Sequence, residues 1–294
     1  MLIKLFITAA LLFCFSLSSY ALDWKAIHEK SDSLNFPKAQ KIYEKNQNSS
    51  ENLYLLGLVC LNEYKNKEAE DIFYKMLKLD PNSKEAQWGR AEVLRRKREY
   101  KPSKEILDRL LEKYPEYVPT YITLAYIKYM EKNFDATVDL AYKVVKMGQD
   151  KVDLNNFVRA HCLVAGAKGM IAHYGGPVSK VVNGRSVLPY LKKAERLQPD
   201  SPSVLFGLGS YYLLIPAVFG RDINKAEEYL LRAIKIDPNF PDIYVRLAQV
   251  EKFRKNNDKY NEYLSKALSL DPLNELARDI SHGKCEFVCL AHDK

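Results

Sequence analysis

The sequence "LDPN" at residues 79–82 returns as "IDPN" at 236–239 and as "LDPL" at 270–273. Pro81 and Pro115 are 34 residues apart, and so are Pro238 and Pro272. Because proline cannot continue a helix, a constant proline spacing marks the ends of equal structural units. A period of about 20 to 50 residues is typical of repeat proteins whose units stack on one another.

Small and large apolar residues recur at fixed distances before these prolines. In the first clear unit they are Leu56, Gly57, Ala69 and Phe73, and in the fifth they are Leu208, Gly209, Ala226, Leu230 and Ala233. Small residues let two helices approach, and the large residues fill the space between them. This pattern resembles the tetratricopeptide repeat. The resemblance implies an all-α fold, an α-solenoid of stacked antiparallel helix pairs with about six repeats and a concave face.

The same pattern divides the chain. We expect a signal peptide at 1–21, a degenerate N-terminal helix pair at 22–49 and the repeat array at 50–272. Insertions at 173–187 and 213–222 stretch the fourth and fifth repeats, and we expect each to lengthen the turn inside its helix pair. Residues 273–294 are predicted to form a capping helix and a tail rich in Cys and His.

The N-terminus has the features of a secretory signal. Lys4 precedes an apolar run at 5–17, which is too short to cross a bilayer comfortably, and small residues lead to a cleavage site after Ala21. We therefore expect an exported protein, periplasmic or secreted, that does not span the membrane. A lipoprotein anchored at Cys14 is the alternative, although Phe13 stands where its processing needs a small residue.

In the family that the repeat resembles, the first helix of each pair presents the concave residues. Mapped onto this sequence, the candidates for binding a protein or peptide partner are Tyr54, Trp88, Arg95, Arg96, Ile122, Tyr126, Tyr129 and Phe206. Aromatic residues suit an extended or helical peptide, and the arginines suit an acidic group on it. The alternative is that neighbouring helices or the N-terminal segment cover these aromatic residues.

The second insertion suggests a different function. Pro216, Gly220, Asp222, Lys225 and Ala226 resemble a pattern in bacterial exported repeat proteins that accompany tripartite (TRAP-type) solute-uptake systems. That resemblance implies a periplasmic accessory protein that binds a small apolar ligand. Considered as local structure alone, Asp222 is predicted to cap the N-terminus of a helix.

The sequence contains none of the common catalytic motifs, so we expect a non-catalytic protein without a cofactor. The net charge of +8, or +7 without the signal, is moderate and gives no reason to expect a nucleic-acid partner. The basic run "LRRKREYK" at 94–101 is expected in a turn, either solvated or in contact with lipid head groups or an acidic partner. Peripheral contact with the cell envelope and a homo-oligomer both stay open.

The C-terminal tail offers three alternatives. Its reactive side chains are His282, Cys285, Cys289 and His292. In an oxidising compartment Cys285 and Cys289 are disulfide candidates, or they remain as thiols packed on the last repeat. A metal site is the weakest candidate, because one straight helix cannot easily place four ligands around one ion. Cys60 and Cys162 are predicted to be buried and inert.

Overall fold

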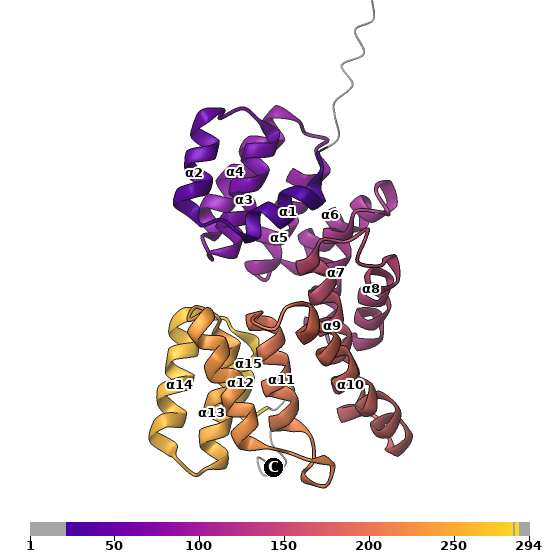
Figure 1. The fold of residues 1–294 in the computed structure, drawn as a ribbon, viewed down its shortest axis with the longest axis vertical. Coiled ribbons are helices and arrows are strands. Elements are labelled where there is room, and N and C mark those ends of the chain that lie inside the picture. Colours follow the sequence, from indigo (N-terminus) through magenta and orange to yellow (C-terminus); the bar gives the residue numbers. More distant parts are fainter. Residues whose placement is uncertain (1–21, 285, 288–294) are drawn as a thin grey trace, which may run out of the picture.

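The computed structural model describes residues 22–284, 286 and 287 (Figure 1). This part of the chain contains fifteen α-helices, one short 3-10 helix and no strand. The predicted all-α solenoid of stacked helix pairs is therefore confirmed. Within the described ranges, none of the helices combines the length and the apolar character needed to cross a membrane.

From the second α-helix onward each α-helix packs against the next one in the sequence, as expected for stacked antiparallel pairs, whereas the first packs mainly against the third. The pairs are α1 (Trp24–Asp32) with α2 (Phe36–Lys45), α3 (Ser50–Asn62) with α4 (Asn66–Leu79), α5 (Lys84–Arg96) with α6 (Tyr100–Lys113), α7 (Val118–Met130) with α8 (Phe134–Met147), α9 (Leu154–Tyr174) with α10 (Pro177–Leu197), α11 (Pro202–Leu214) with α12 (Ile223–Ile236), and α13 (Pro241–Phe253) with α14 (Asn257–Leu270). A last helix, α15 (Glu275–Ser281), follows them.

The two insertions differ from the lengthened turns expected of them. The first adds length to the helices, since α9 and α10 have 21 residues each and only Gly175 and Gly176 separate them. Pro177 occupies the first turn of α10, where its missing N–H would have no helical partner anyway. The second insertion forms the short 3-10 helix η1 (Ala217–Phe219). Asp222 caps α12 through a 2.9 Å bond from the Lys225 backbone N–H, as predicted.

The small residues of the repeat are required by close packing. The Phe73 ring lies between Gly57 of α3 and Gly89 of α5. A Cβ atom added at Gly89 would lie 2.2 Å from that ring, and one added at Gly57 would lie 2.8 Å from it. Phe73 is itself 1% exposed, so the ring has no space into which it could move. This contact sets the distance between the first two complete repeats.

The turns inside four helix pairs share one backbone feature. Tyr64, Arg98, Lys132 and Lys255 have φ values of 60° to 62°, in the left-handed region that disfavours residues with a Cβ atom. At each turn the next residue donates its N–H to a carbonyl five residues back, as Glu99 does to Leu94 at 3.0 Å. The first three of these residues are spaced by 34 positions, so they occupy equivalent places in consecutive repeats.

Three of these left-handed residues reach across to the C-terminal arm. The Tyr64 hydroxyl donates to Asp237 at 2.6 Å, and the Lys132 ammonium donates to Glu286 at 2.6 Å. The Arg98 guanidinium bonds Asp271 at 2.5 Å and both carboxylate oxygens of Glu275 at 3.1 and 3.2 Å. We call these three contacts the clasp.

The clasp joins segments far apart in sequence. Figure 1 shows α1–α6 in the upper half, α11–α15 at the lower left, and α7–α10 connecting them on the right. The basic run at 94–101 supplies part of the contact, because Arg98 and Tyr100 both bond Glu275. Lys97 in the same run pairs with Glu70 at 2.6 Å. Much of the run's charge is therefore engaged within the protein.

Replacing Arg98 with Gly is expected to lower the free energy of unfolding by about 1 to 2 kcal/mol relative to Lys255→Gly. Both changes relieve left-handed backbone strain, but Lys255 makes no side-chain hydrogen bond or ion pair with any described residue. Urea unfolding measures the difference. Small-angle scattering should show a larger radius of gyration for Arg98→Gly alone. Equal stability and equal dimensions in the two variants would mean that the clasp contributes nothing.

Candidate functional site

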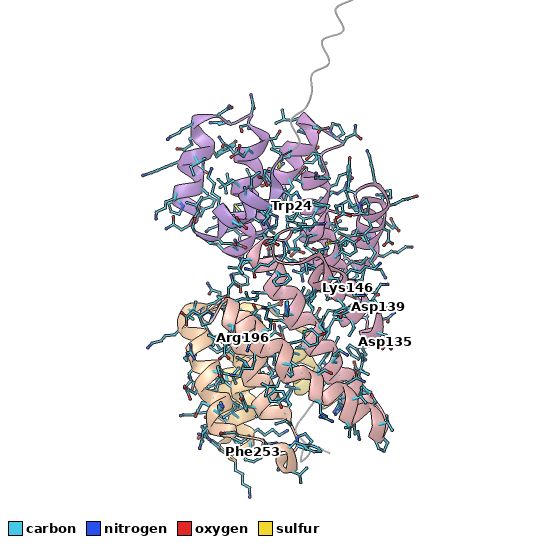
Figure 2. All side chains as sticks on the ribbon, turned by 45° about the vertical axis from the view of Figure 1, so that its right-hand side comes forward. Trp24, Asp135, Asp139, Lys146, Arg196 and Phe253 are labelled. Atoms are coloured by element: carbon cyan, nitrogen blue, oxygen red, sulfur yellow. The ribbon has the colours of Figure 1, made fainter. Side chains whose placement is uncertain are left out.

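The concave face of the solenoid encloses a cavity of about 1370 Å³. Its walls come mainly from the first helices of the pairs, with α1, α10 and α15 completing them. Figure 2 shows the side chains on the ribbon, with Asp135 and Asp139 on the outer face of α8. Because the clasp joins the two arms, this concave surface receives side chains from both halves of the chain.

The structure brings together most of the partner-binding residues predicted from sequence. The residues that line the cavity are Trp88, Arg95, Arg96, Ile122, Tyr126, Tyr129 and Phe206. Tyr54 does not line it, because α1 covers this side chain completely. Among the residues that do line the wall, Trp88 is only 6% exposed, whereas Tyr126, Tyr129 and Phe206 are half-buried and present their rings to the cavity.

The two predicted arginines are engaged within the protein. Arg95 donates to both Glu92 oxygens at 2.9 and 2.6 Å, and Arg96 donates to the same carboxylate at 3.0 Å. Burial by itself raises the pKa of Glu92, but the two guanidinium groups outweigh it and hold the pKa at about 2. The Arg95 guanidinium also lies over the Tyr126 ring, 4.2 Å from its centre.

This ion cluster extends to the neighbouring repeat. The Trp88 indole N–H donates to the Thr123 hydroxyl at 3.0 Å, and that hydroxyl donates to Glu92 at 3.1 Å. A second bond of Arg96 reaches the Leu61 carbonyl at 2.8 Å. These side chains therefore fix the wall between three repeats, and their charges are largely balanced before any partner arrives.

Sequence reasoning missed several charged residues that line the cavity, and two of them, Arg159 and Asp32, lie near α1. Arg159 of α9 is exposed to the cavity and makes no side-chain hydrogen bond or ion pair with any described residue. Asp32, at the end of α1, also faces the cavity. Burial raises the pKa of Asp32 to about 6, and Arg159 and the amides of Asn155 and Asn62 oppose that rise. The fourth repeat is stretched, so its register could not be assigned and Arg159 gave no usable signal.

Helix α1 fills the N-terminal end of the concave face through His28. One ring nitrogen of His28 lies 2.7 Å from the Tyr54 hydroxyl, which in turn lies 2.8 Å from the Tyr117 hydroxyl. The Trp24 ring meets His28 and Tyr117 edge to face, with centres 5.8 and 5.6 Å apart. These contacts explain why Tyr54 belongs to the core: the N-terminal segment covers it, as the alternative interpretation of the aromatic residues allowed.

The C-terminal end of the cavity is more apolar. Phe206 packs against Phe240, and Phe287 stacks on Tyr129 with ring centres 6.2 Å apart. Further apolar lining comes from Met130, Leu163, Met170, Val187, Leu214 and Leu276. We call the end near α1 the polar end, and the end near α11 and α15 the apolar end, although the charged side chains of Asp242, Arg246 and Glu275 also line the latter.

The cysteines and the tail add no recognisable metal centre among the described residues, where no three His, Cys, Asp or Glu side chains are grouped suitably. Cys60 is buried as predicted, but Cys162 lines the cavity and is only half-buried. Burial raises the pKa of both thiols to about 12. His282 ends α15 and is exposed, whereas Cys285, Cys289 and His292 lie outside the described residues, so the tail alternatives stay predictions.

Comparison with known proteins agrees with this architecture. Two tetratricopeptide repeat family models match the sequence, one over residues 61–125 and the other over 220–240. The fold is that of a tetratricopeptide-repeat solenoid. A comparison with curated proteins found no match.

Solved structures similar to this chain share its fold at low sequence identity. A tetratricopeptide repeat protein from Parabacteroides merdae is 14% identical, with a TM-score of 0.53 and coverage of 87% of this chain and 96% of that one. The human IFIT1 dimer with m7Gppp-AAAA is also 14% identical, with a TM-score of 0.60, and covers 85% of this chain. A chain of the APC/C hetero-tetramer Cut9–Hcn1 is 15% identical, with a TM-score of 0.59, and covers 90%. This chain spans only 56% and 49% of the length of the last two.

The His28 cluster predicts a dependence of stability on pH. Burial lowers the pKa of His28 to about 4, Asp153 opposes this and Arg159 adds to it. The unfolded chain binds a proton near pH 6.5 and the folded chain does not, so this stability is present above pH 6.5 and is lost as pH falls towards 4. We expect the loss between pH 7 and pH 4 to be about 3 kcal/mol.

A His28→Gln variant isolates this effect, because glutamine does not titrate. Urea unfolding at several pH values should show that the difference in stability between the original protein and the variant shrinks as pH falls from 7 to 4. A difference that stays constant over this range would show that His28 is not held neutral by the fold.

Proposed function

We propose that this tetratricopeptide-repeat protein is a non-catalytic, exported scaffold that binds a peptide segment of a partner protein inside the cavity. The observation that carries the proposal is the size of the cavity together with its lining. At about 1370 Å³ it exceeds the roughly 300–1,000 Å³ of typical small-molecule sites. Half-buried aromatic rings line it, and such rings bind peptides with little loss of side-chain freedom.

The two ends of the cavity suggest which residues the peptide carries. Arg159 presents a guanidinium that no described side chain neutralises by direct contact, so an acidic group of the peptide would lie there. Phe206 and Phe240 at the other end suit an apolar side chain. Arg95 and Arg96 instead support the wall, because Glu92 already occupies both.

A second candidate is the small apolar ligand of a solute-uptake accessory protein. It is favoured by the apolar end of the cavity, where the second insertion contributes Pro216 and Phe219 to the lining. A small apolar ligand would not use the polar end of the cavity or Arg159, which pairs with no described residue. We therefore favour the peptide.

Arg159→Glu is expected to weaken partner binding at least tenfold, because it places a negative charge opposite the acidic group of the peptide. Arg90→Glu is the matched control. Arg90 is also exposed on the first helix of a pair and makes no side-chain hydrogen bond or ion pair with any described residue, but it does not line the cavity. Cross-linking of tagged protein in its native cells, followed by mass spectrometry, measures which proteins are recovered and which residues they touch.

The result that supports the proposal is a partner whose cross-links map to the cavity and which is lost with Arg159→Glu alone. Equal recovery with both variants would contradict the peptide site. Native mass spectrometry that finds a bound small apolar molecule in repeated preparations would favour the second candidate instead.

Export is part of the proposal, and residues 1–21, which carry the predicted signal, lie outside the described residues. We expect protein purified from its native cells to begin at Leu22, because Ala21 precedes the predicted cleavage site. The intact mass measures this directly. A mature chain that retains residues 1–21, or one that carries lipid on Cys14, would contradict the predicted processing.

A further inference from the structure

The positive charge of this protein is concentrated in one segment. Residues 154–221, which form α9, α10, α11 and η1, contain eight Lys or Arg and only two Asp or Glu. The whole chain has a net charge of +8, so this segment carries most of it. No acidic residue occurs between 154 and 194. Seven of the eight cations lie in α9 and α10, so the charge belongs mainly to the fourth repeat, and Arg221 is the contribution of η1 and its flanks.

The same repeats expose apolar side chains at the tips of their turns. Val178 is 76% exposed, Val218 is 85% exposed and Phe219 is 69% exposed. Tyr174, Val181, Val182 and Phe253 are further large apolar residues exposed at the turns of the fourth, fifth and sixth repeats. Proteins seldom expose a cluster of large apolar side chains to water unless the cluster binds a partner, a ligand or a membrane.

The three turns lie at one end of the molecule. Figure 1 shows the α9–α10 turn, the η1 segment and the α13–α14 turn all at the lower end of the view, and Figure 2 places Phe253 there. The Arg221 guanidinium lies 5.9 Å from the centre of the Phe253 ring, which connects η1 to the end of α13. We call the exposed residues of 173–187, 215–222 and 252–259 the basic apolar edge.

Cations accompany the apolar tips along this edge. Lys180 and Arg185 of α10 are exposed and make no side-chain ion pair with any described residue. Lys255 lies at the α13–α14 turn. Of the nearby acids, Asp222 caps α12 and Glu227 is paired with Arg254 at 2.6 Å. Asp258 is exposed in the first turn of α14. The edge therefore presents a net positive charge together with apolar side chains.

We infer that the basic apolar edge docks this protein onto an anionic lipid surface. Apolar side chains that enter the head-group region, with Lys and Arg beside them, are the combination that binds peripheral proteins to such membranes. The protruding tips of three turns can settle on a soft, flat surface. Lys180, Arg185 and Phe219 also line the cavity, so docking would bring one mouth of the cavity to the lipid.

The test is co-sedimentation of residues 22–294, which include every described helix, with vesicles. One set contains phosphatidylcholine and phosphatidylglycerol in about a 2:1 ratio, and the other contains phosphatidylcholine alone. We expect binding to the anionic vesicles only, weakened by added salt. Removing both cations with Lys180→Gln and Arg185→Gln should weaken it about thirtyfold.

The matched control is Lys38→Gln with Lys41→Gln, which removes two exposed lysines from α2 at the other end of the solenoid. A second variant, Val218→Ser with Phe219→Ser, tests the apolar contribution and should also reduce binding. Circular dichroism melting of each variant verifies the fold. Losses in the edge variants with the control unchanged support the inference.

Three results would overturn it. The first is that the unmodified chain does not bind anionic vesicles, which would indicate that the edge binds a protein partner and not a membrane. The second is an equal loss in the edge and control variants, which would indicate attraction by overall charge. The third is that binding appears only after residues 288–294 are removed, which would indicate that this segment, and not a membrane, is the natural occupant of the edge. None of these results bears on the peptide site, which is tested by Arg159→Glu.

Discussion

The Arg98 guanidinium, held by Asp271 and Glu275, connects the two arms of the superhelix. Stacked helix pairs by themselves give only a curved surface, because each repeat contacts its neighbours and nothing beyond them. Here the second complete repeat bonds to the end of the last one. This long-range contact joins the two arms, and both arms line the cavity between them.

The clasp depends on a backbone conformation that is unfavourable for these residues. A side chain in the left-handed region costs about 1 kcal/mol or more relative to glycine, which is why glycine is usual at such turns. Tyr64, Arg98 and Lys132 nevertheless occupy it, and each bonds an acidic residue in the other arm. Glycine would fit the turn without strain but would leave the acidic residue without its partner. At these three turns the contact across the solenoid offsets part of that cost, whereas Lys255 has the same conformation without such a contact to any described residue.

Electrostatics inside the cavity separate supporting residues from available ones. Glu92 holds two arginines and has a pKa of about 2, so it stays charged at any pH the protein is expected to meet. That ion cluster holds the cavity wall in place, and Glu92 neutralises much of the positive charge of Arg95 and Arg96 that a ligand could otherwise bind. Arg159 and Asp32 both line the polar end of the cavity without a direct bond between them, and they are the groups that a peptide bound there would meet. The basic apolar edge lies at the other end of the cavity, where Lys180, Arg185 and Phe219 also line it, so the proposed membrane contact and the Arg159 end of the peptide site use different residues.

The features that could be predicted from the sequence depend on contacts within one or two repeats, whereas those that were missed depend on contacts between distant segments. The 34-residue proline spacing and the Gly57, Phe73 and Gly89 contacts are local to one or two repeats, and local packing alone selects stacked helix pairs. The Asp222 cap and the concave position of Tyr126 and Phe206 follow from the same register.

Tertiary structure decided the rest. Whether Tyr54 faces a groove or the core depends on α1, and whether Arg98 is solvated or paired depends on a helix about 175 residues further along the chain. Arg159 could not be predicted as a concave residue, because the extra length of the fourth repeat left its residues without assigned repeat positions. Sequence spacing thus determined the repeat, its helices and its concave side. Only the folded chain decided where the two arms meet, because curvature accumulates over many repeats and no single repeat encodes the contact that closes it.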